Sequence, residues 1–343
     1  MKTLPRRDFL RAGAASLLAA GLTRSVANRA DAAEPTIASA PDTALGYKCA
    51  GIRMIPIDGG KYRVWTKRVG AGKIKLLTLH GGPGATHEYL ECFEDFLPPA
   101  GVEFYYYDQL GSSYSDQPND TSLWTIERFR EEVEQVRVAL GLEDFYLWGG
   151  SWGGMLGIEY ALQYQRHLKG FILSNMTASI ASFTKYVAQL RLQLPADAIA
   201  VLDKYEAKGD FENPEYQAVM FGQIYAKHLC RIDPMPDPVQ RAFKHLAAPV
   251  YNTMQGPNEF VVTGNFKDWD RWNDLQKIKV PTLVMGATYD EMNPEDIKRE
   301  GTLLPRSRTA ICENGSHLSM WDDQEAYFRH LLGFINDVEA GRI

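Results

Sequence analysis

The chain has 343 residues, a hydrophobic fraction of 45%, a charged fraction of 23% and a net charge of −6. These values are ordinary for a globular domain, and the acidic balance gives no reason to expect a nucleic-acid partner. The four cysteines form neither a CxxC pair nor a metal-ligand spacing, so we expect no metal centre and interpret them as buried side chains.

The N-terminus carries a pattern typical of an export signal. Residues 5–11 contain two adjacent arginines followed by Phe-Leu-Arg, and a weakly apolar stretch follows from Ala12 to Leu22. Small residues then supply cleavage sites. This order predicts a twin-arginine signal over residues 1–32 and a linker over 33–46. We therefore expect the protein to engage the twin-arginine export machinery, to act in the periplasm or outside the cell, and not to insert stably into a membrane.

Strand and helix patterns alternate after the linker. Short apolar runs bounded by turns predict strands over Ile52–Ile57, Tyr62–Lys67, Lys75–Leu79, Val102–Tyr107, Phe145–Trp148 and Gly170–Leu173. Helical spacing of apolar residues predicts helices over Glu88–Leu97, Ile126–Leu140 and Trp152–Tyr164. Repeated strand–helix–strand units imply an α/β fold, in which a mostly parallel sheet has helices on both faces.

The pattern changes over residues 176–272. Strand signals are weak there, and helical segments with mixed charge are broken by prolines, which predicts an inserted helical cap. Strands at Thr282–Met285 and Thr309–Cys312 and a helix at Glu325–Val338 then resume the earlier rhythm. We therefore expect one core, built from residues 47–175 and 273–343, with the cap inserted into it.

Residues 149–153 read Gly-Gly-Ser-Trp-Gly between a predicted strand and a predicted helix. This G-x-S-x-G turn is typical of the nucleophile elbow of the α/β-hydrolase fold, which lifts a serine hydroxyl above the sheet. Ser151 is therefore the candidate nucleophile of a serine hydrolase. The alternative is an ordinary glycine-rich turn.

A nucleophilic serine needs a base and an acid that orients the base. Among seven histidines, His317 alone lies in a loop after the last strand, where this fold places its base. The loop after Thr282–Met285 carries Asp290, our candidate for the acid, and Glu291 is its rival. The serine–acid–histidine order matches the fold, and the alternative for His317 is a surface histidine.

Two backbone N–H groups are candidates for an oxyanion hole. Trp152 begins the predicted helix after the nucleophile, and its backbone N–H can donate to a developing oxyanion. The glycine-rich turn at residues 80–84 follows a core strand, and within it we choose Gly82 as the second donor. The same turn also serves as an ordinary strand-to-helix connection.

These motifs together resemble the proline iminopeptidase family of serine peptidases, which also contains amino-acid amidases. The resemblance covers nearly the whole chain after the linker. It consists of HGGPG at residues 80–84, GGSWGG at 149–154, the Asp-Glu pair at 290–291 and Ser-His at 316–317. A further family motif, Asp-Gln-x-Gly-x-Gly-x-Ser, is approached at residues 108–115, where Ser113 replaces the second glycine.

The resemblance implies how a substrate is chosen. In this family acidic residues hold the free α-amino group, and the matching positions here are Glu291 and Glu259. A buried ammonium beside the nucleophile needs such a countercharge. Without the resemblance, Glu259 would be interpreted as a solvated residue of the cap. Trp269 and Trp272 fit either a pocket wall or the core.

The resemblance therefore implies a serine aminopeptidase that releases an N-terminal residue, often proline, from a peptide or amide through an acyl-enzyme. It requires no metal or organic cofactor. Amino-acid amidases, esterases and lactonases on the same scaffold are the nearest alternatives, and a noncatalytic binding protein is a more distant one. A serine at the elbow argues against epoxide hydrolases and dehalogenases, which use a carboxylate there.

Overall fold

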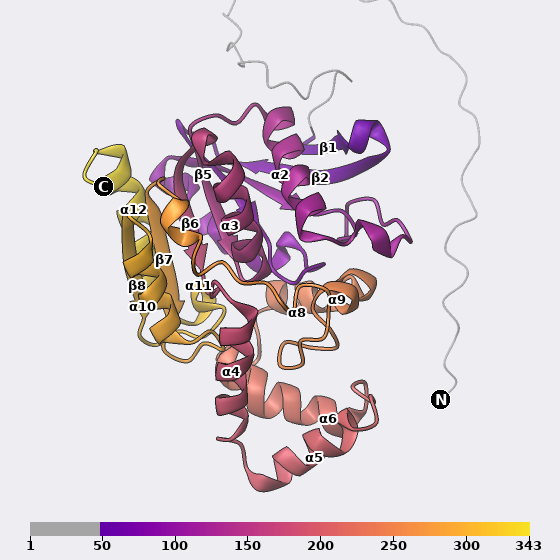
Figure 1. The fold of residues 1–343 in the computed structure, drawn as a ribbon. Coiled ribbons are helices and arrows are strands. Elements are labelled where there is room, and N and C mark those ends of the chain that lie inside the picture. The colour runs from indigo at the N-terminus through magenta and orange to yellow at the C-terminus, as the bar shows by residue number, and fades with distance from the viewer. Residues whose placement is uncertain (1–48) are drawn as a thin grey trace, which may run out of the picture. The chain divides into compact units, whose positions relative to one another are not determined.

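The structure is a computed structural model that describes residues 49–343, coloured in Figure 1. The expected signal and linker lie outside these residues. One eight-stranded sheet has the order β1-β2-β4-β3-β5-β6-β7-β8, and its pairs are parallel from β4 onward. The strands are β1 (Ile52–Ile57), β2 (Tyr62–Val69), β3 (Ile74–Leu79), β4 (Val102–Asp108), β5 (Phe145–Gly150), β6 (Leu168–Ser174), β7 (Thr282–Ala287) and β8 (Ser307–Cys312).

Helices cover both faces of this sheet, as the alternating pattern predicts (Figure 1). One core cluster joins the sheet to α2 (Ile126–Leu140), α3 (Trp152–Tyr164) and α10 (Pro294–Leu303). A second cluster joins the opposite face to α1 (Phe93–Phe96) and α12 (Gln324–Glu339). Successive side chains of the central strands alternate between the two clusters, so both faces of the sheet are buried. The expected fold class is confirmed.

The described chain between β6 and β7 contains helices and no strand. We call α4 to α9 the cap helices; they are α4 (Ile180–Arg191), α5 (Ala196–Glu206), α6 (Pro214–Val219), α7 (Ala226–His228), α8 (Asp237–Lys244) and α9 (Ala248–Met254). A π-helical turn, η7 (Met220–Tyr225), joins α6 to α7. Part of this insertion has its own apolar cluster around Leu202, Tyr216 and Ile224.

The prediction of one continuous helix over Glu88–Leu97 is wrong, because the structure has two short helices there. They are η3 (His87–Leu90) and α1 (Phe93–Phe96). The carbonyl of Tyr89 accepts from the indole of Trp321 at 2.7 Å, and the carbonyl of Leu90 accepts from the hydroxyl of Tyr106 at 3.2 Å. These carbonyls would otherwise support a continuous helix, so tertiary donors compete with the helical hydrogen bonds there.

Candidate active site

Ser151 occupies a sharp turn between β5 and α3. Its φ of 55° and ψ of −129° are unusual for a residue with a side chain, and such strain is typical of functional turns. A Cβ on Gly149 would lie 2.2 Å from the carbonyl oxygen of Gly153, and one on Gly153 would lie 2.0 Å from that of Leu79. Only glycines allow the strand, turn and helix to approach this closely.

His317 and Asp290 lie together at the ends of the last two strands. Nδ1 of His317 lies 2.8 Å from Oδ1 of Asp290, and both side chains are buried. A proton on Nδ1 donated to Asp290 leaves Nε2 free to act as a base. Glu291 lies farther away, with its Oε1 3.8 Å from the same Nδ1. The geometry favours Asp290 over Glu291 as the residue that orients the imidazole.

Asn175 is a member of this cluster that sequence reasoning missed. Its Nδ2 donates to Oδ2 of Asp290 at 2.7 Å, while Asp290 Oδ1 also accepts from the N–H of Met292 at 3.0 Å. Asn175 has a positive φ of 51°, which asparagine tolerates better than most residues. Its position directly after β6, beside the strand that carries the nucleophile, is the signal in the sequence that could have identified it.

The two expected oxyanion donors belong to Gly82 and Trp152, which line the same small cavity as Ser151. The N–H of Gly81 donates to the hydroxyl of Tyr89 at 2.7 Å, whereas no hydrogen bond within the described residues uses the N–H of Gly82. The N–H of Trp152 belongs to the first turn of α3, where backbone donors have no partner within the helix. Gly82 and Trp152 both line the cavity beside Ser151, so both N–H groups remain available to an oxyanion.

A buried hydrogen-bond network joins the loops that carry these two donors. Gln109 Oε1 accepts from the indole of Trp152 at 2.8 Å, and its Nε2 donates to the carbonyl of His80 at 3.1 Å. The N–H of Gln109 donates to Nε2 of His80 at 3.0 Å. The same motif carries Ser113, whose φ of 23° falls in the region that favours the glycine of related sequences.

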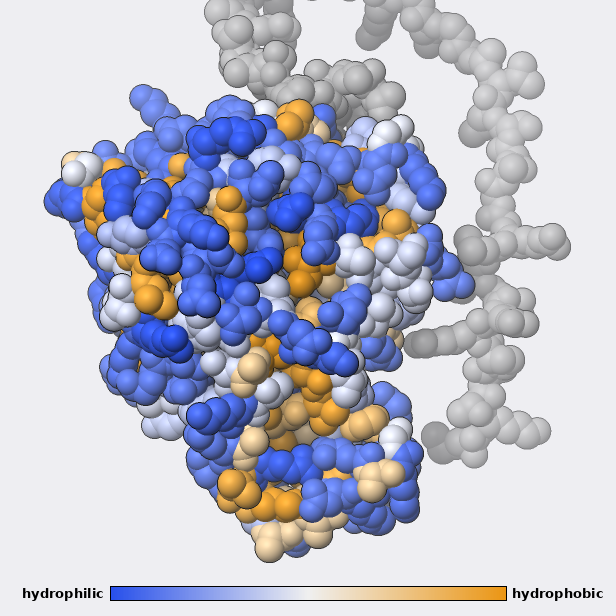
Figure 2. Space-filling view, in the orientation of Figure 1, coloured by the Kyte–Doolittle hydropathy of each residue, from blue (hydrophilic) through white to orange (hydrophobic). Residues whose placement is uncertain are grey.

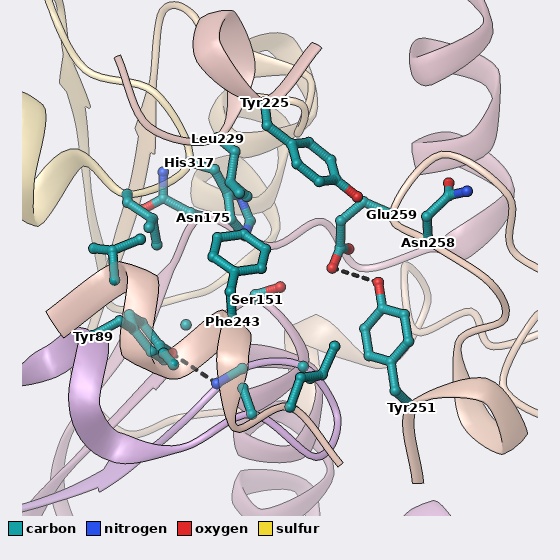
Figure 3. Close-up of a pocket in the computed structure, with 18 of the residues that line it drawn as sticks. Tyr89, Ser151, Asn175, Tyr225, Leu229, Phe243, Tyr251, Asn258, Glu259 and His317 are labelled. Atoms are coloured by element: carbon teal, nitrogen blue, oxygen red, sulfur yellow. Dashed lines mark hydrogen bonds between the residues drawn. The ribbon is translucent and has the colours of Figure 1, made fainter. Parts of the chain in front are cut away.

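Two carboxylates lie near the catalytic candidates: Glu259 lines both cavities at Ser151, and Glu291 lies beside His317 without lining either cavity. Oε1 of Glu259 accepts from the hydroxyl of Tyr251 at 2.6 Å (Figure 3). Glu291 is fully buried, and neither of its carboxylate oxygens has a hydrogen-bond partner. Burial raises the pKa of Glu259 and raises that of Glu291 well above its ordinary value. One partly buried and one fully buried carboxylate, the latter with unused acceptor capacity, are suited to binding a cation.

Ser151 lies where two cavities meet, and Gly82 and Glu259 line both of them. The larger cavity has a volume of about 340 Å³ and includes His317 in its wall (Figure 3). The smaller one has room for about one water molecule. Its apolar walls are Met155, Met176, Ile180, Phe183, Phe266 and Met292. The tryptophans Trp269 and Trp272 line neither cavity and pack in the core.

The loop of His317 is also hydrogen-bonded to the inserted segment. The N–H of His317 donates to the carbonyl of His228 at 3.0 Å, and that of Leu318 donates to the carbonyl of Leu229 at 2.8 Å. The N–H of Arg231 donates to Asp322 at 3.0 Å. The backbone that positions the base is therefore attached to the end of α7.

Comparison with known proteins agrees with this architecture. Residues 75–324 match the family model of the alpha/beta hydrolase fold. The proline iminopeptidase of Flavobacterium johnsoniae is 48% identical over 296 residues, covering 84% of this chain and 100% of the relative. The proline iminopeptidase of Elizabethkingia meningoseptica is 48% identical over 294 residues, covering 84% of this chain and 99% of that protein.

Solved structures give the same result. The proline iminopeptidase of Mycobacterium smegmatis superposes with a TM-score of 0.78 at 30% identity, over 85% of this chain and 100% of that one. The structure of VinJ superposes with a TM-score of 0.80 at 34% identity, over 84% of this chain and 98% of that one. The chain therefore belongs to the alpha/beta hydrolase fold and, within it, to the proline iminopeptidase family.

Proposed function

We propose that the protein is a serine aminopeptidase that releases an N-terminal residue, with proline favoured, from peptides or amides. The observation that carries this proposal is a pair of carboxylates near a serine at a nucleophile elbow: Glu259 is partly buried and lines both cavities with Ser151, and Glu291 is fully buried behind His317. Such a pair attracts the free α-ammonium of a chain end and disfavours a blocked one. Relatives that are 48% identical are proline iminopeptidases, which supports the same substrate.

In the proposed mechanism, Oγ of Ser151 attacks the carbonyl carbon of the N-terminal residue while Nε2 of His317 takes the hydroxyl proton. Asp290 stabilises the imidazolium, and the N–H groups of Gly82 and Trp152 bind the oxyanion. His317 then donates its proton to the leaving nitrogen as the C–N bond breaks. Water, deprotonated by the same histidine, hydrolyses the acyl-enzyme and frees Ser151.

The small cavity is suited to the ring of the acyl residue. Besides Trp152, six apolar residues form its wall, and three of these are methionines, whose flexible side chains adapt to a ligand of irregular shape. Because the cavity has room for about one water molecule, a proline ring requires these side chains to move. Glu259 lines the same cavity, so its carboxylate is available to the ring nitrogen, which is the α-amine of an N-terminal proline.

The proposal is tested by comparing kcat/KM for the anilides of proline, alanine and N-acetylproline. We expect prolyl anilide to react fastest and the N-blocked compound to react at least about a hundredfold more slowly. Glu259→Gln and Glu291→Gln should each reduce this preference, because each removes a countercharge to the ammonium. Ser151→Ala should abolish both hydrolysis and labelling by a fluorophosphonate. Equal rates on free and blocked substrates would instead indicate a general amidase or esterase.

We also propose that the protein is exported by the twin-arginine route. The order of basic, apolar and small residues in positions 1–32 supports this localisation. In the described residues, no helix combines the length and apolarity required to span a bilayer. Cell fractionation of the wild type and of a variant with Arg6 and Arg7 replaced by lysine tests the proposal. Retention of only the variant in the cytoplasm is the expected outcome.

A further inference from the structure

The larger cavity beside Ser151 differs from the smaller one in which catalytic groups it contains. His317 lines only the larger cavity, whereas Trp152 lines only the smaller one. A general acid has to touch the atom that it protonates, and His317 protonates the leaving nitrogen in the proposed mechanism. The leaving group therefore belongs in the larger cavity.

The walls of this cavity are chiefly apolar. They include Phe221, Tyr225, Leu229, Val239, Phe243 and Leu246, contributed by η7, the segment after α7, and the α8 region. The rings of Phe221, Tyr225 and Phe243 contact one another, with centroids separated by 5.1 to 6.0 Å. Figure 2 shows apolar surface gathered where the lower cap helices meet the rest of the described body. A volume of about 340 Å³ holds a large side chain.

The charged side chains that line the larger cavity also bear on which leaving groups it accepts. Among the described residues that line it, none is a lysine or an arginine, and the carboxylates are Glu259 at the nucleophile and Glu212, which is solvent-exposed. The lining residue that can carry a positive charge is His317, which the leaving nitrogen engages in the proposed mechanism. The leaving residue of a dipeptide carries its own carboxylate into this space. That carboxylate would find apolar walls and no second cationic side chain as a countercharge, which is unfavourable.

We infer that the larger cavity is a binding site for an apolar leaving residue whose carboxyl group is blocked or extended, as in an amide or a longer peptide. The inference rests on the proposed aminopeptidase function and specifies its substrate class. The preferred substrates are then X-Φ amides and peptides of three or more residues, where X is the released residue and Φ is a large apolar one. Free dipeptides are poor substrates.

Four substrates that share a free N-terminal proline test this inference: prolyl-leucinamide, prolyl-glycinamide, prolyl-leucine and prolyl-leucyl-glycine. We expect kcat/KM for the leucinamide to exceed that for the glycinamide at least about tenfold, because the glycinamide leaves the apolar walls uncontacted. The free dipeptide should fall at least about tenfold below the leucinamide. The tripeptide should recover most of that loss, because its carboxylate lies one residue farther out.

A charge placed in the wall gives a second, independent measurement. Phe221 is 42% exposed, so Phe221→Lys changes the cavity without removing a buried side chain. This variant should raise kcat/KM for prolyl-leucine relative to prolyl-leucinamide at least about fivefold. Leu192→Lys is the matched control, because Leu192 is 78% exposed and does not line the cavity. The control should keep the wild-type ratio.

The outcomes separate this inference from the proposed function. Similar rates on the leucinamide, the glycinamide and the free dipeptide would overturn the inference while leaving the aminopeptidase function intact. An unchanged acid-to-amide ratio in folded Phe221→Lys would overturn the carboxylate argument. If the protein hydrolysed none of the four prolyl substrates and did not hydrolyse prolyl anilide, the proposed function itself would be overturned.

Discussion

The carboxylate of Glu291 faces the same imidazole nitrogen of His317 that donates to Asp290. The two contacts differ by one ångström, 3.8 Å for Glu291 and 2.8 Å for Asp290. Burial alone would lower the pKa of His317, but the charges of Asp290 and Glu291 outweigh it and raise this pKa to about 9. The site without substrate therefore favours the protonated imidazole, which is not a base.

This relationship predicts a pH profile. Acylation of Ser151 by an uncharged reagent, p-nitrophenyl acetate, should rise with pH up to about 9 as His317 loses its proton. Glu291→Gln removes a negative charge and should move the profile to lower pH. At pH 7.5 this variant should therefore react faster than the wild type with the acetate, although it hydrolyses prolyl anilide more slowly. Stopped-flow measurement from pH 5 to 10 checks both expectations.

The control for that experiment is Glu295→Gln, which makes the same change at an exposed side chain paired with Lys298. It should leave the profile unchanged. A profile identical in the wild type and Glu291→Gln would contradict an electrostatic effect of Glu291 on His317. In that case Glu291 would act on the substrate amine alone.

A second prediction concerns Asn175, which supports Asp290 without a direct role in the chemistry. Asn175→Ala removes the 2.7 Å hydrogen bond to the carboxylate, and bonds to charged groups contribute about 1.5–3 kcal/mol. We expect kcat to fall at least about tenfold and KM to change less, because the lost hydrogen bond orients Asp290 and His317, whereas Asn175 is only one of the many residues that line the larger cavity. Steady-state kinetics with prolyl anilide measures the two constants separately.

Asn265→Ala is the matched control. It removes a side-chain hydrogen bond of the same length, 2.7 Å, but the acceptor is the carbonyl of Trp124 and not a residue of the proposed triad. Thermal unfolding of both variants separates loss of fold from loss of activity. A kcat within twofold of the wild type in Asn175→Ala would show that Asp290 needs no support from Asn175.

A third prediction concerns the packing of the elbow. Gly153→Ala places a Cβ against the backbone of Leu79, at 2.0 Å from its oxygen, and should destabilise the fold by about 1–3 kcal/mol or more. Gly333→Ala lies within α12, where the added Cβ meets nothing within 4 Å, and should stabilise by up to about 1 kcal/mol. Urea unfolding should therefore shift in opposite directions. Equal shifts would contradict the close contact of β3 and α3.

A fourth prediction concerns Arg241, which joins α8 to Glu88 in η3 at 2.8 Å and to Glu91, the residue after η3, at 2.6 Å. Burial would raise the pKa of Glu88, but hydrogen bonds from His245, Arg241 and Thr86 outweigh it and lower this pKa. A lowered carboxylate pKa contributes stability that is present above about pH 4.5, its ordinary value, and is lost as pH falls below it.

Arg241→Met should therefore lower the free energy of unfolding at pH 7 more than at pH 3.5. It should also raise KM for prolyl-leucinamide, because α8 supplies part of the wall of the larger cavity. Arg191→Met is the control, since its ion pairs join Arg191 to Asp203 and Glu206 within the cap helices. An unchanged KM in Arg241→Met would show that α8 holds its position without this network.

The sequence predicted most of the sheet because its buried strands are short apolar runs between clear turns. It also predicted that Ser151, Asp290 and His317 follow strand ends, and the structure brings the latter two within 2.8 Å. The break after Leu90 was beyond prediction, since its cause is hydrogen bonds from Tyr106 and Trp321, far away in the chain. Asn175 was missed for a different reason: an amide carries no charge, so it has no signature of catalysis until its partner is known.

The attachment of the histidine loop to the end of α7 has a consequence for substrate entry. The hydrogen bonds from His317 and Leu318 to the carbonyls of residues 228 and 229 couple the position of His317 to that of the cap segment at the end of α7. If this cap segment moved away as a rigid body, these hydrogen bonds would break or His317 would move with the segment. The serine would then be without its proton acceptor. A substrate that enters past the side chains at the mouth of the larger cavity would leave these hydrogen bonds intact, and His317 would keep its place beside Asp290.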